Sequence, residues 1–183
     1  TNTTIDFKIN ALKLIFNYAY KMGDIKFNPV KQIMLFKKDT KEKGIFTLDE
    51  TNKLFGNDAL ENIWNNNLNI FTLNLIAFHT GCRLGELQAL QVQDINLQDS
   101  CIEIKHSWND RFGLGDTKTG KNRIIPVSKE LMGKLLNLSW GKDDDDFVFS
   151  DTDGKTPIAR YKIYVQFKKA LCTIGITEEE RQK

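Results

Sequence analysis

Cysteine, histidine and long apolar runs are all scarce in this 183-residue sequence. The three cysteines, Cys82, Cys101 and Cys172, form no Cys-x-x-Cys pair, so neither a disulfide framework nor a zinc site is indicated. No stretch approaches the roughly 20 apolar residues that cross a bilayer. We therefore expect no metal, no cofactor and no membrane span, and a reducing, cytoplasmic location. The sequence starts without a methionine, and we expect it to be part of a longer protein.

Net charge is also low, at +2, which looks too weak for a nucleic-acid binder. Divided by segment, however, residues 1–43 carry +5, 44–104 carry −6, 105–134 carry +4 and the remainder carries −1. Contacts to phosphates need local rather than total charge. The pattern is typical of a protein in which only some surfaces face DNA, although solvated helices with a chance asymmetry would look the same.

Hydrophobic spacing predicts mostly helices, with a change of texture after residue 92. A capping box at Thr47 predicts one helix start. Short strand-like runs follow, separated by a glycine-containing loop at 109–121, so the fold class is mainly α with a small antiparallel β-sheet (α+β). Helices are expected at 4–22, 30–36, 48–55, 58–66, 68–79, 83–90, 129–138 and 159–173, and strands near 95, 101–104, 123–127 and 147–149.

A charged stretch without apolar anchors, residues 38–45, is the best candidate for a domain boundary. It is expected to link a short first segment, 1–37, to a larger domain, 46–183.

The most informative motif places an arginine after a glycine break at the end of an apolar helix. Arg83 follows Gly81, and Glu86 lies three residues further on, where the two side chains can pair. Only five arginines occur against 21 lysines. A guanidinium held by a carboxylate is suited to grip a phosphate. On spacing alone, a structural ion pair at a helix junction explains the motif equally well.

Two stretches together resemble the tyrosine recombinase (phage integrase) family. The first, Thr80-Gly81-Cys82-Arg83-Leu84-Gly85-Glu86-Leu87 with Leu90 and Asp94-Ile95, is similar to that family's first conserved box. The second, Thr117-Lys118-Thr119-Gly120-Lys121 before Arg123-Ile124-Ile125-Pro126, is similar to its lysine hairpin and Arg-x-x-Pro strand. Residues 1–36 resemble, less specifically, the last helices of the core-binding domain. The implied fold is the catalytic fold of these enzymes.

The resemblance implies roles for individual residues. Arg83 matches the arginine that holds the scissile phosphate, Glu86 the acid that orients the basic groups, and Lys118 the lysine that protonates the departing 5′ oxygen. Lys121 is a rival for the lysine role. Further DNA contacts are expected from Lys105, Arg111, Lys121 and Arg123.

The family's His-x-x-Arg box is absent, because neither His79 nor His106 has an arginine three residues later. The later tyrosine nucleophile also has no counterpart. The resemblance thus implies a site-specific DNA recombinase, an integrase of a phage or mobile element, that acts as a homotetramer on double-stranded DNA. We expect these 183 residues alone to be inactive. The alternative is a non-catalytic DNA-binding protein on the same fold. The target site, the host and the choice among integration, excision and chromosome-dimer resolution stay open.

Other signals are weaker. Residues 115–121 match the GxxxxGK core of a phosphate-binding loop, but a strand follows where that loop needs a helix. The acidic stretches 143–146 and 151–154 lack the ligand spacing of a Ca²⁺ loop. His79 is expected to be packed inside its helix.

Overall fold

The protein is described by a computed structural model that covers residues 2–36, 44–118, 120–151 and 153–177. The chain divides into two compact units at Gly44 and Ile45. The predicted linker, 38–45, lies mostly outside the described residues. Among the described residues no helix is long and apolar enough to cross a membrane.

The first unit contains one long helix, α1 (Asn2–Met22), close to the predicted 4–22. The helix predicted at 30–36 was wrong. The Asn28 side chain accepts a hydrogen bond from Val30 N at 3.0 Å, and Asp6 accepts one from Phe36 N at 2.9 Å. The Phe36 N–H, which a helix over 30–36 would direct to Gln32 O, is thus bonded to Asp6, and the segment forms a turn followed by irregular backbone instead.

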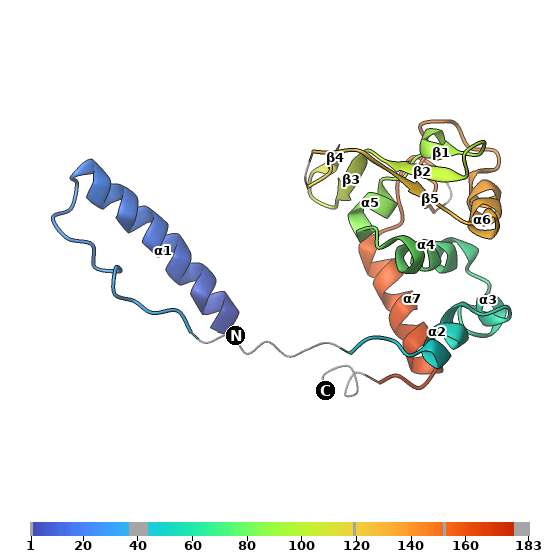
Figure 1. The fold of residues 1–183 in the computed structure, drawn as a ribbon, viewed down its shortest axis with the longest axis horizontal. Helices are drawn as coiled ribbons and strands as arrows, with labels where there is room; N and C mark the ends of the chain where they lie inside the picture. Colours follow the sequence, from blue (N-terminus) through green and yellow to red (C-terminus); the bar gives the residue numbers. More distant parts are fainter. Residues whose placement is uncertain (1, 37–43, 119, 152, 178–183) are drawn as a thin grey trace. The chain divides into compact units, whose positions relative to one another are not determined.

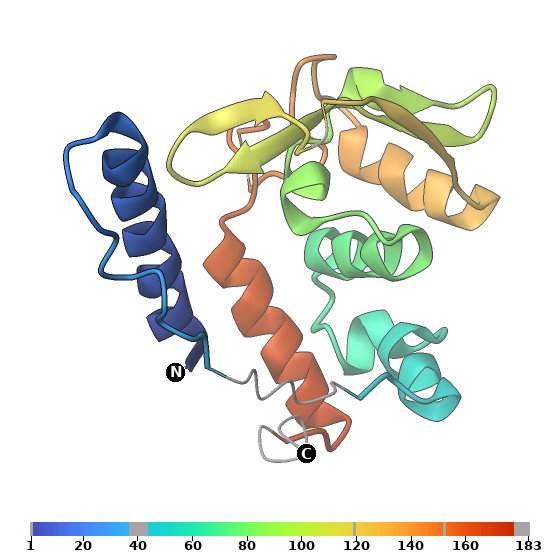
Figure 2. The same ribbon diagram turned by 60° about the vertical axis from the view of Figure 1, so that its left-hand side comes forward.

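In the second unit a small sheet lies over a set of helices. The larger sheet has the antiparallel order β1-β2-β5, and a separate hairpin pairs β3 with β4. Helix α4 packs against α5, α6 and α7, and α5 packs against β3 (Figures 1 and 2). The mainly α fold with a small antiparallel sheet is therefore confirmed. The elements are α2 (Leu48–Phe55), α3 (Ala59–Asn62), α4 (Leu68–Thr80), α5 (Leu84–Gln88), η1 (Val92–Asp94), β1 (Ile95–Asn96), β2 (Cys101–Ile104), β3 (His106–Asn109), β4 (Gly113–Asp116), β5 (Arg123–Pro126), α6 (Lys129–Ser139) and α7 (Arg160–Thr173).

Two helices in this unit, α2 and α6, start at side-chain caps, and the cap of α2 is the predicted one. Thr47 and Glu50 form the capping box, with Thr47 N donating to the Glu50 carboxylate at 2.7 Å. Ser128 Oγ accepts from Leu131 N at 3.2 Å and starts α6. These caps satisfy free N–H groups of the first helical turn.

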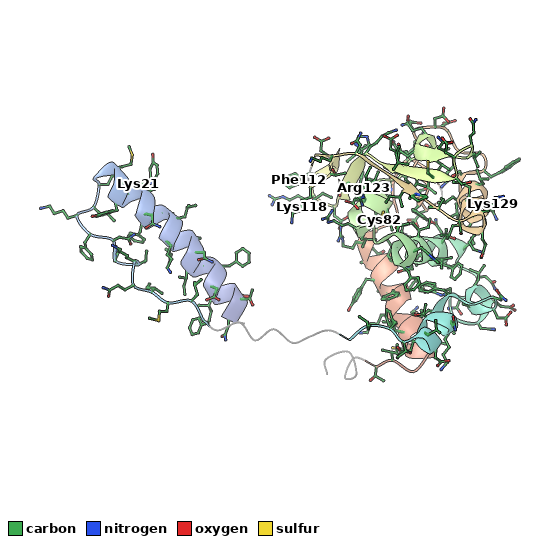
Figure 3. All side chains as sticks on the ribbon, in the orientation of Figure 1. Lys21, Cys82, Phe112, Lys118, Arg123 and Lys129 are labelled. Atoms are coloured by element: carbon green, nitrogen blue, oxygen red, sulfur yellow. The ribbon has the colours of Figure 1, made fainter. Side chains whose placement is uncertain are left out.

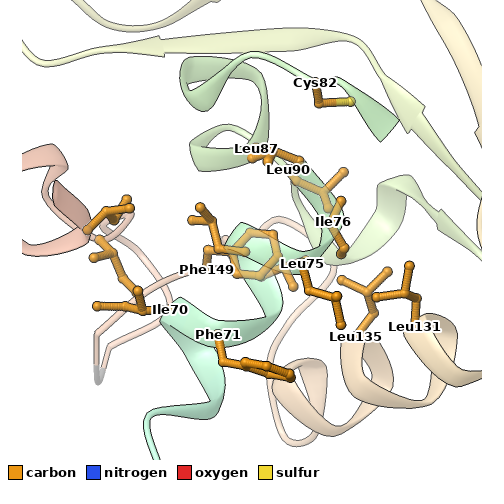
Figure 4. Close-up of a cluster of buried hydrophobic side chains, with 14 of the residues drawn as sticks. Ile70, Phe71, Leu75, Ile76, Cys82, Leu87, Leu90, Leu131, Leu135 and Phe149 are labelled. Carbon is orange, nitrogen blue, oxygen red and sulfur yellow. The ribbon is translucent and has the colours of Figure 1, made fainter. Parts of the chain in front are cut away.

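The core gathers around α4, which is apolar on most sides. Phe71, Leu75 and Ile76 of this helix face Leu135 of α6 and Phe149 (Figure 4). Removal of such side chains from water is the main favourable contribution to folding. This packing also holds the C-terminal end of α4 in place, where the candidate site begins.

Three strand assignments differ from the prediction. β3 was not predicted as a strand, and the loop predicted at 109–121 contains β4. The two strands pair from His106↔Asp116 to Asn109↔Gly113. The strand predicted at 147–149 is absent, and only isolated bridges such as Gln91↔Phe147 form there. The backbone of that buried segment is satisfied elsewhere, since Val148 N donates to Leu90 O at 2.9 Å and Lys142 Nζ donates to Val148 O at 2.8 Å.

Candidate DNA-cleavage site

A left-handed turn at the end of α4 places Arg83. Gly81 has φ +65°, which favours glycine, and its N–H caps the helix by donating to Ala77 O at 3.0 Å. The chain then extends through buried Cys82 to Arg83, the residue before α5. The side chain of Arg83 is 59% exposed. The guanidinium is therefore attached to a rigid junction while most of it faces solvent.

Glu86 holds this arginine in place. Its side chain is 1% exposed, and it accepts hydrogen bonds from Arg83 N at 2.9 Å and from Arg83 Nη1 at 3.0 Å. The pairing predicted from the i, i+3 spacing is thus confirmed. Its geometry is that of a residue capping a helix start from the third helical position, rather than of two side chains along one helical face.

Arg123, predicted as a DNA contact, lies against the same carboxylate. From β5, its Nη1 donates to Glu86 Oε1 at 3.1 Å and its Nη2 to Glu86 Oε2 at 2.6 Å. Nη2 also lies 3.7 Å from Cys82 Sγ. Arg83, Glu86 and Arg123, here termed the arginine–glutamate cluster, therefore join the start of α5 to the sheet through one buried carboxylate.

The cluster keeps Glu86 ionised. Burial by itself would raise the pKa of this carboxyl, but the hydrogen bonds from Arg123 and from the backbone and side chain of Arg83 outweigh that effect. The pKa falls from 4.5 to about 2. A buried carboxylate is tolerated because it is paired and hydrogen-bonded. Two arginines against one glutamate leave the cluster with one net positive charge, suited to an anion.

The loop after β4 carries both candidate lysines. Thr117 is buried, its hydroxyl donates to Lys121 O at 3.2 Å, and its carbonyl accepts from Gly120 N at 2.9 Å. Lys118 and Lys121 are both exposed. Phe112 lies in the turn between β3 and β4, whereas Lys118 follows the other end of β4, two residues after Asp116; Figure 3 labels both, together with Arg123 and Cys82. The general-acid role of Lys118 and the rival role of Lys121 remain predictions.

Helix α5 and the β3–β4 hairpin pack closely through a glycine. A Cβ added to Gly85 would lie 2.7 Å from Ser107 Oγ and 2.8 Å from Trp108 O, both on β3. Such distances leave no room for a side chain. Gly85 therefore sets the distance between the helix that begins after Arg83 and the hairpin that leads to Lys118.

The other two predicted DNA contacts differ in their surroundings. Lys105 ion-pairs with Asp94 at 3.0 Å and with Glu103 at 3.1 Å, so its charge is balanced within the protein. Arg111 is exposed at the tip of the β3–β4 hairpin, with its guanidinium carbon 5.3 Å from the centre of the Phe112 ring. Contact of either residue with DNA remains a prediction.

Two features outside the cluster are also clear. His79 is exposed, so the packed position expected for it was wrong; its ring contacts that of Phe78.

Asp143 and Asp145 gather near Asp146, but the Lys155 ammonium lies at 3.5 and 3.2 Å from the first two and also pairs with the third. A lysine therefore takes the central position that a cation would need.

Sequence reasoning missed the places of Arg123 and Gly85 in this site. A weak signal for Arg123 existed, because strand alternation puts residue 123 on the same face as Ile125 and Val127, and an inward-facing arginine needs a carboxylate partner. No comparable signal identified Gly85, since its tight contact is with a strand that is distant in the sequence.

An arginine held at a glycine turn by a buried glutamate thus lies in a mainly helical domain, and the β3–β4 hairpin that packs against α5 leads into a loop with two exposed lysines. Residues 45–182 match the Phage integrase family. The chain belongs to this family, as part of a tyrosine recombinase catalytic domain.

Similar proteins support the assignment. Tyrosine recombinase XerC of Thermodesulfovibrio yellowstonii is 28% identical over 139 residues, which cover 74% of this chain and 42% of that protein. IntQ of Escherichia coli (strain K12), whose name describes it as a defective protein, is 26% identical over 136 residues, 72% of this chain and 32% of that protein. The Tn1549 transposon integrase, solved in complex with a circular intermediate DNA, superposes with a TM-score of 0.75 at 20% identity and covers 99% of this chain and 61% of that one. The chain thus spans about a third to three fifths of the proteins that it matches.

Proposed function

We propose that this chain is the part of a site-specific DNA recombinase that grips the scissile phosphate, and that the longer protein integrates or excises a phage or other mobile element. The observation that carries the proposal is the arginine–glutamate cluster. It presents a largely exposed arginine, fixed at its base by a buried carboxylate, in a domain of the integrase family.

In the proposed reaction a tyrosine hydroxyl loses its proton to solvent water and attacks the phosphorus, and the bond from phosphorus to the 5′ oxygen breaks. Arg83 stabilises the charge on the phosphoryl oxygens in the transition state. Lys118 gives its proton to the departing 5′ oxygen, and a 3′-phosphotyrosyl link remains. Attack by another strand's 5′ hydroxyl reverses these steps. The covalent link conserves the phosphodiester's free energy, so no metal or nucleotide cofactor is needed.

The tyrosine is proposed to come from outside these 183 residues. Tyr161 and Tyr164 are exposed on α7, and Tyr18 and Tyr20 belong to the first unit. None of them follows a His-x-x-Arg sequence. The 183 residues alone should accordingly bind DNA without cleaving it.

Duplex DNA is the proposed partner, and a homotetramer on two duplexes the proposed assembly of the longer protein. Support comes from the integrases solved with DNA and from the two basic segments, 1–43 at +5 and 105–134 at +4. Arg111 and Lys121 are proposed as backbone contacts, and Lys105 as a less direct one because two acids already balance it. Residues 1–37 are proposed to be the end of a core-binding domain.

Fluorescence anisotropy with a labelled duplex at several salt concentrations tests the proposal on the chain itself. Basic contacts to phosphates release counterions, so affinity should fall steeply as salt rises. Binding that ignores salt, or no binding at low salt, would contradict it.

A non-catalytic DNA-binding protein on the same fold is the second candidate, and a longer protein that also lacks the His-x-x-Arg box would favour it. The longer protein separates the two. A nicked suicide duplex traps the covalent adduct if the protein is an enzyme, whereas a DNA-binding protein shifts the same duplex without forming any adduct.

A further inference from the structure

Arg123 lies on the inward face of its strand. In the β2–β5 pairing it stands opposite buried Ile104, and along β5 it alternates with exposed Ile124. Its side chain is 38% exposed. A charged side chain in this position requires a partner, because unpaired burial of charge is costly. The partner is Glu86, which contacts both terminal nitrogens.

The geometry of this contact is a fork. The two bonds, 3.1 Å to Oε1 and 2.6 Å to Oε2, run from one planar guanidinium to one carboxylate. A bidentate pair fixes orientation as well as distance, which the single charge of a lysine does not do. The same two oxygens then accept from Arg83, Oε2 from its backbone N and Oε1 from its Nη1. The orientation of Arg83 therefore depends on an oxygen that Arg123 fixes.

We infer that Arg123 is a positioning residue for Arg83, acting through Glu86, and not one of the DNA contacts. Its Nη2 is also within 3.7 Å of Cys82 Sγ, so its guanidinium is engaged on the protein side of the cluster. Arg83 is more exposed, at 59%, and in the described part of the chain its side chain makes one hydrogen bond, through Nη1. Of the two arginines, Arg83 thus retains the N–H groups that a phosphate would need. The catalytic consequence rests on the proposed function, whereas the geometric claim does not.

The first experiment uses the 183-residue chain and needs no catalysis. Arginine side-chain ¹⁵N NMR can resolve all five arginines, with Arg111→Met as the matched control because Arg111 is an exposed arginine outside the cluster. In the wild type and in Arg111→Met, Arg83 should show slow rotation of its guanidinium, and the Glu86 carboxyl carbon should not titrate between pH 7 and 4. In Arg123→Met, Arg83 should rotate fast and Glu86 should begin to titrate in that range.

Arg123→Lys provides the second variant, since it keeps a positive charge beside buried Glu86 and so disturbs folding less than Arg123→Met. In this variant the Glu86 carboxylate should titrate at lower pH than in Arg123→Met, because the lysine keeps a positive charge beside it. The Arg83 guanidinium should still rotate fast, because a lysine cannot form the bidentate hydrogen bond that orients the carboxylate. A merely structural role would not separate these two signals. Unchanged Arg83 and Glu86 signals in both variants would overturn the inference.

The second experiment compares DNA binding with catalysis in the longer protein. With saturating suicide duplex, Arg123→Lys should slow adduct formation roughly 10- to 100-fold while the slope of log affinity against log salt stays at the wild-type value. A DNA contact would do the reverse, lowering that slope by about 0.9 and leaving the saturated rate unchanged. If the wild type forms no adduct, the proposed function fails, and the NMR result on the chain still decides whether Arg123 positions Arg83.

Discussion

Gly85→Ala should destabilise the second unit and displace the β3–β4 hairpin. The added Cβ would lie 2.7 Å from Ser107 Oγ and 2.8 Å from Trp108 O. The hydroxyl can rotate away, but Trp108 O belongs to the backbone of β3, which pairs with β4 at Trp108↔Leu114. Either α5 or the hairpin must therefore shift by several tenths of an ångström.

The magnitude follows from two opposing effects. Overpacking of a well-packed site costs about 1–3 kcal/mol. Alanine is the better helix former, by up to about 1 kcal/mol, although less at the start of a five-residue helix such as α5. We expect a net loss of about 1–2 kcal/mol in the free energy of unfolding, or a fall in Tm of about 2–8 °C for a domain of this size.

Gly133→Ala is the matched control. Gly133 lies within α6, and a Cβ added there meets no atom within 4 Å. The same change should therefore stabilise the protein by about 0.5–1 kcal/mol. Urea unfolding followed by circular dichroism measures both variants. A Gly85→Ala protein as stable as Gly133→Ala would refute the packing argument.

Three further predictions concern charge and catalysis. The pKa of Glu86 is about 2 in the folded chain against an ordinary 4.5, so its contribution to the free energy of unfolding, about 3 kcal/mol, should be fully present above pH 5 and be lost as pH falls toward 2. In Glu86→Gln the urea midpoint should therefore depend less on pH over that range. A dependence as steep as that of the wild type would contradict this prediction. Lys142 donates to three buried acceptors, at 3.0 Å to Phe147 O and at 2.8 Å to Val148 O and to Ser150 Oγ. Lys142→Met leaves these acceptors unpaired and should lower the free energy of unfolding in urea by about 2–4 kcal/mol. A loss under about 0.5 kcal/mol would show that water satisfies the three acceptors. In the longer protein, Lys118→Ala should cleave ordinary DNA about 10²–10⁴-fold more slowly than the wild type. Its cleavage rate should recover on a substrate with a bridging 5′ sulfur, because the sulfur leaves without a proton. Recovery of Lys121→Ala alone would reverse the assignment of the general acid.

Local signals in the sequence were enough to predict most helices. The cap residues Thr47 and Ser128 and the break at Gly81 act within one turn of the chain, so they can be read without knowing the fold. The Arg83–Glu86 pair was predictable for the same reason, since the partners are three residues apart.

The errors came from strand pairing and from contacts that the local sequence pattern does not show. Gly113–Asp116 has two glycines and no β-branched residue, and it becomes a strand only because the turn after Asn109 brings it beside β3. Arg123 is 37 residues from Glu86 in the sequence, and it reaches Glu86 only because β5 pairs with β2. Neither relation leaves a mark in the local sequence beyond the alternation of one short strand.

The most direct test of the proposed site is the single-turnover rate of covalent adduct formation on a suicide duplex, measured with the longer protein carrying Arg83→Ala. Loss of one preorganised group at the transition state typically lowers the rate about 10²–10³-fold, while many other phosphate contacts keep the duplex bound. The account predicts that slow rate with DNA binding close to the wild type. An Arg83→Ala protein that accumulates adduct at the wild-type rate would remove Arg83 from the active site.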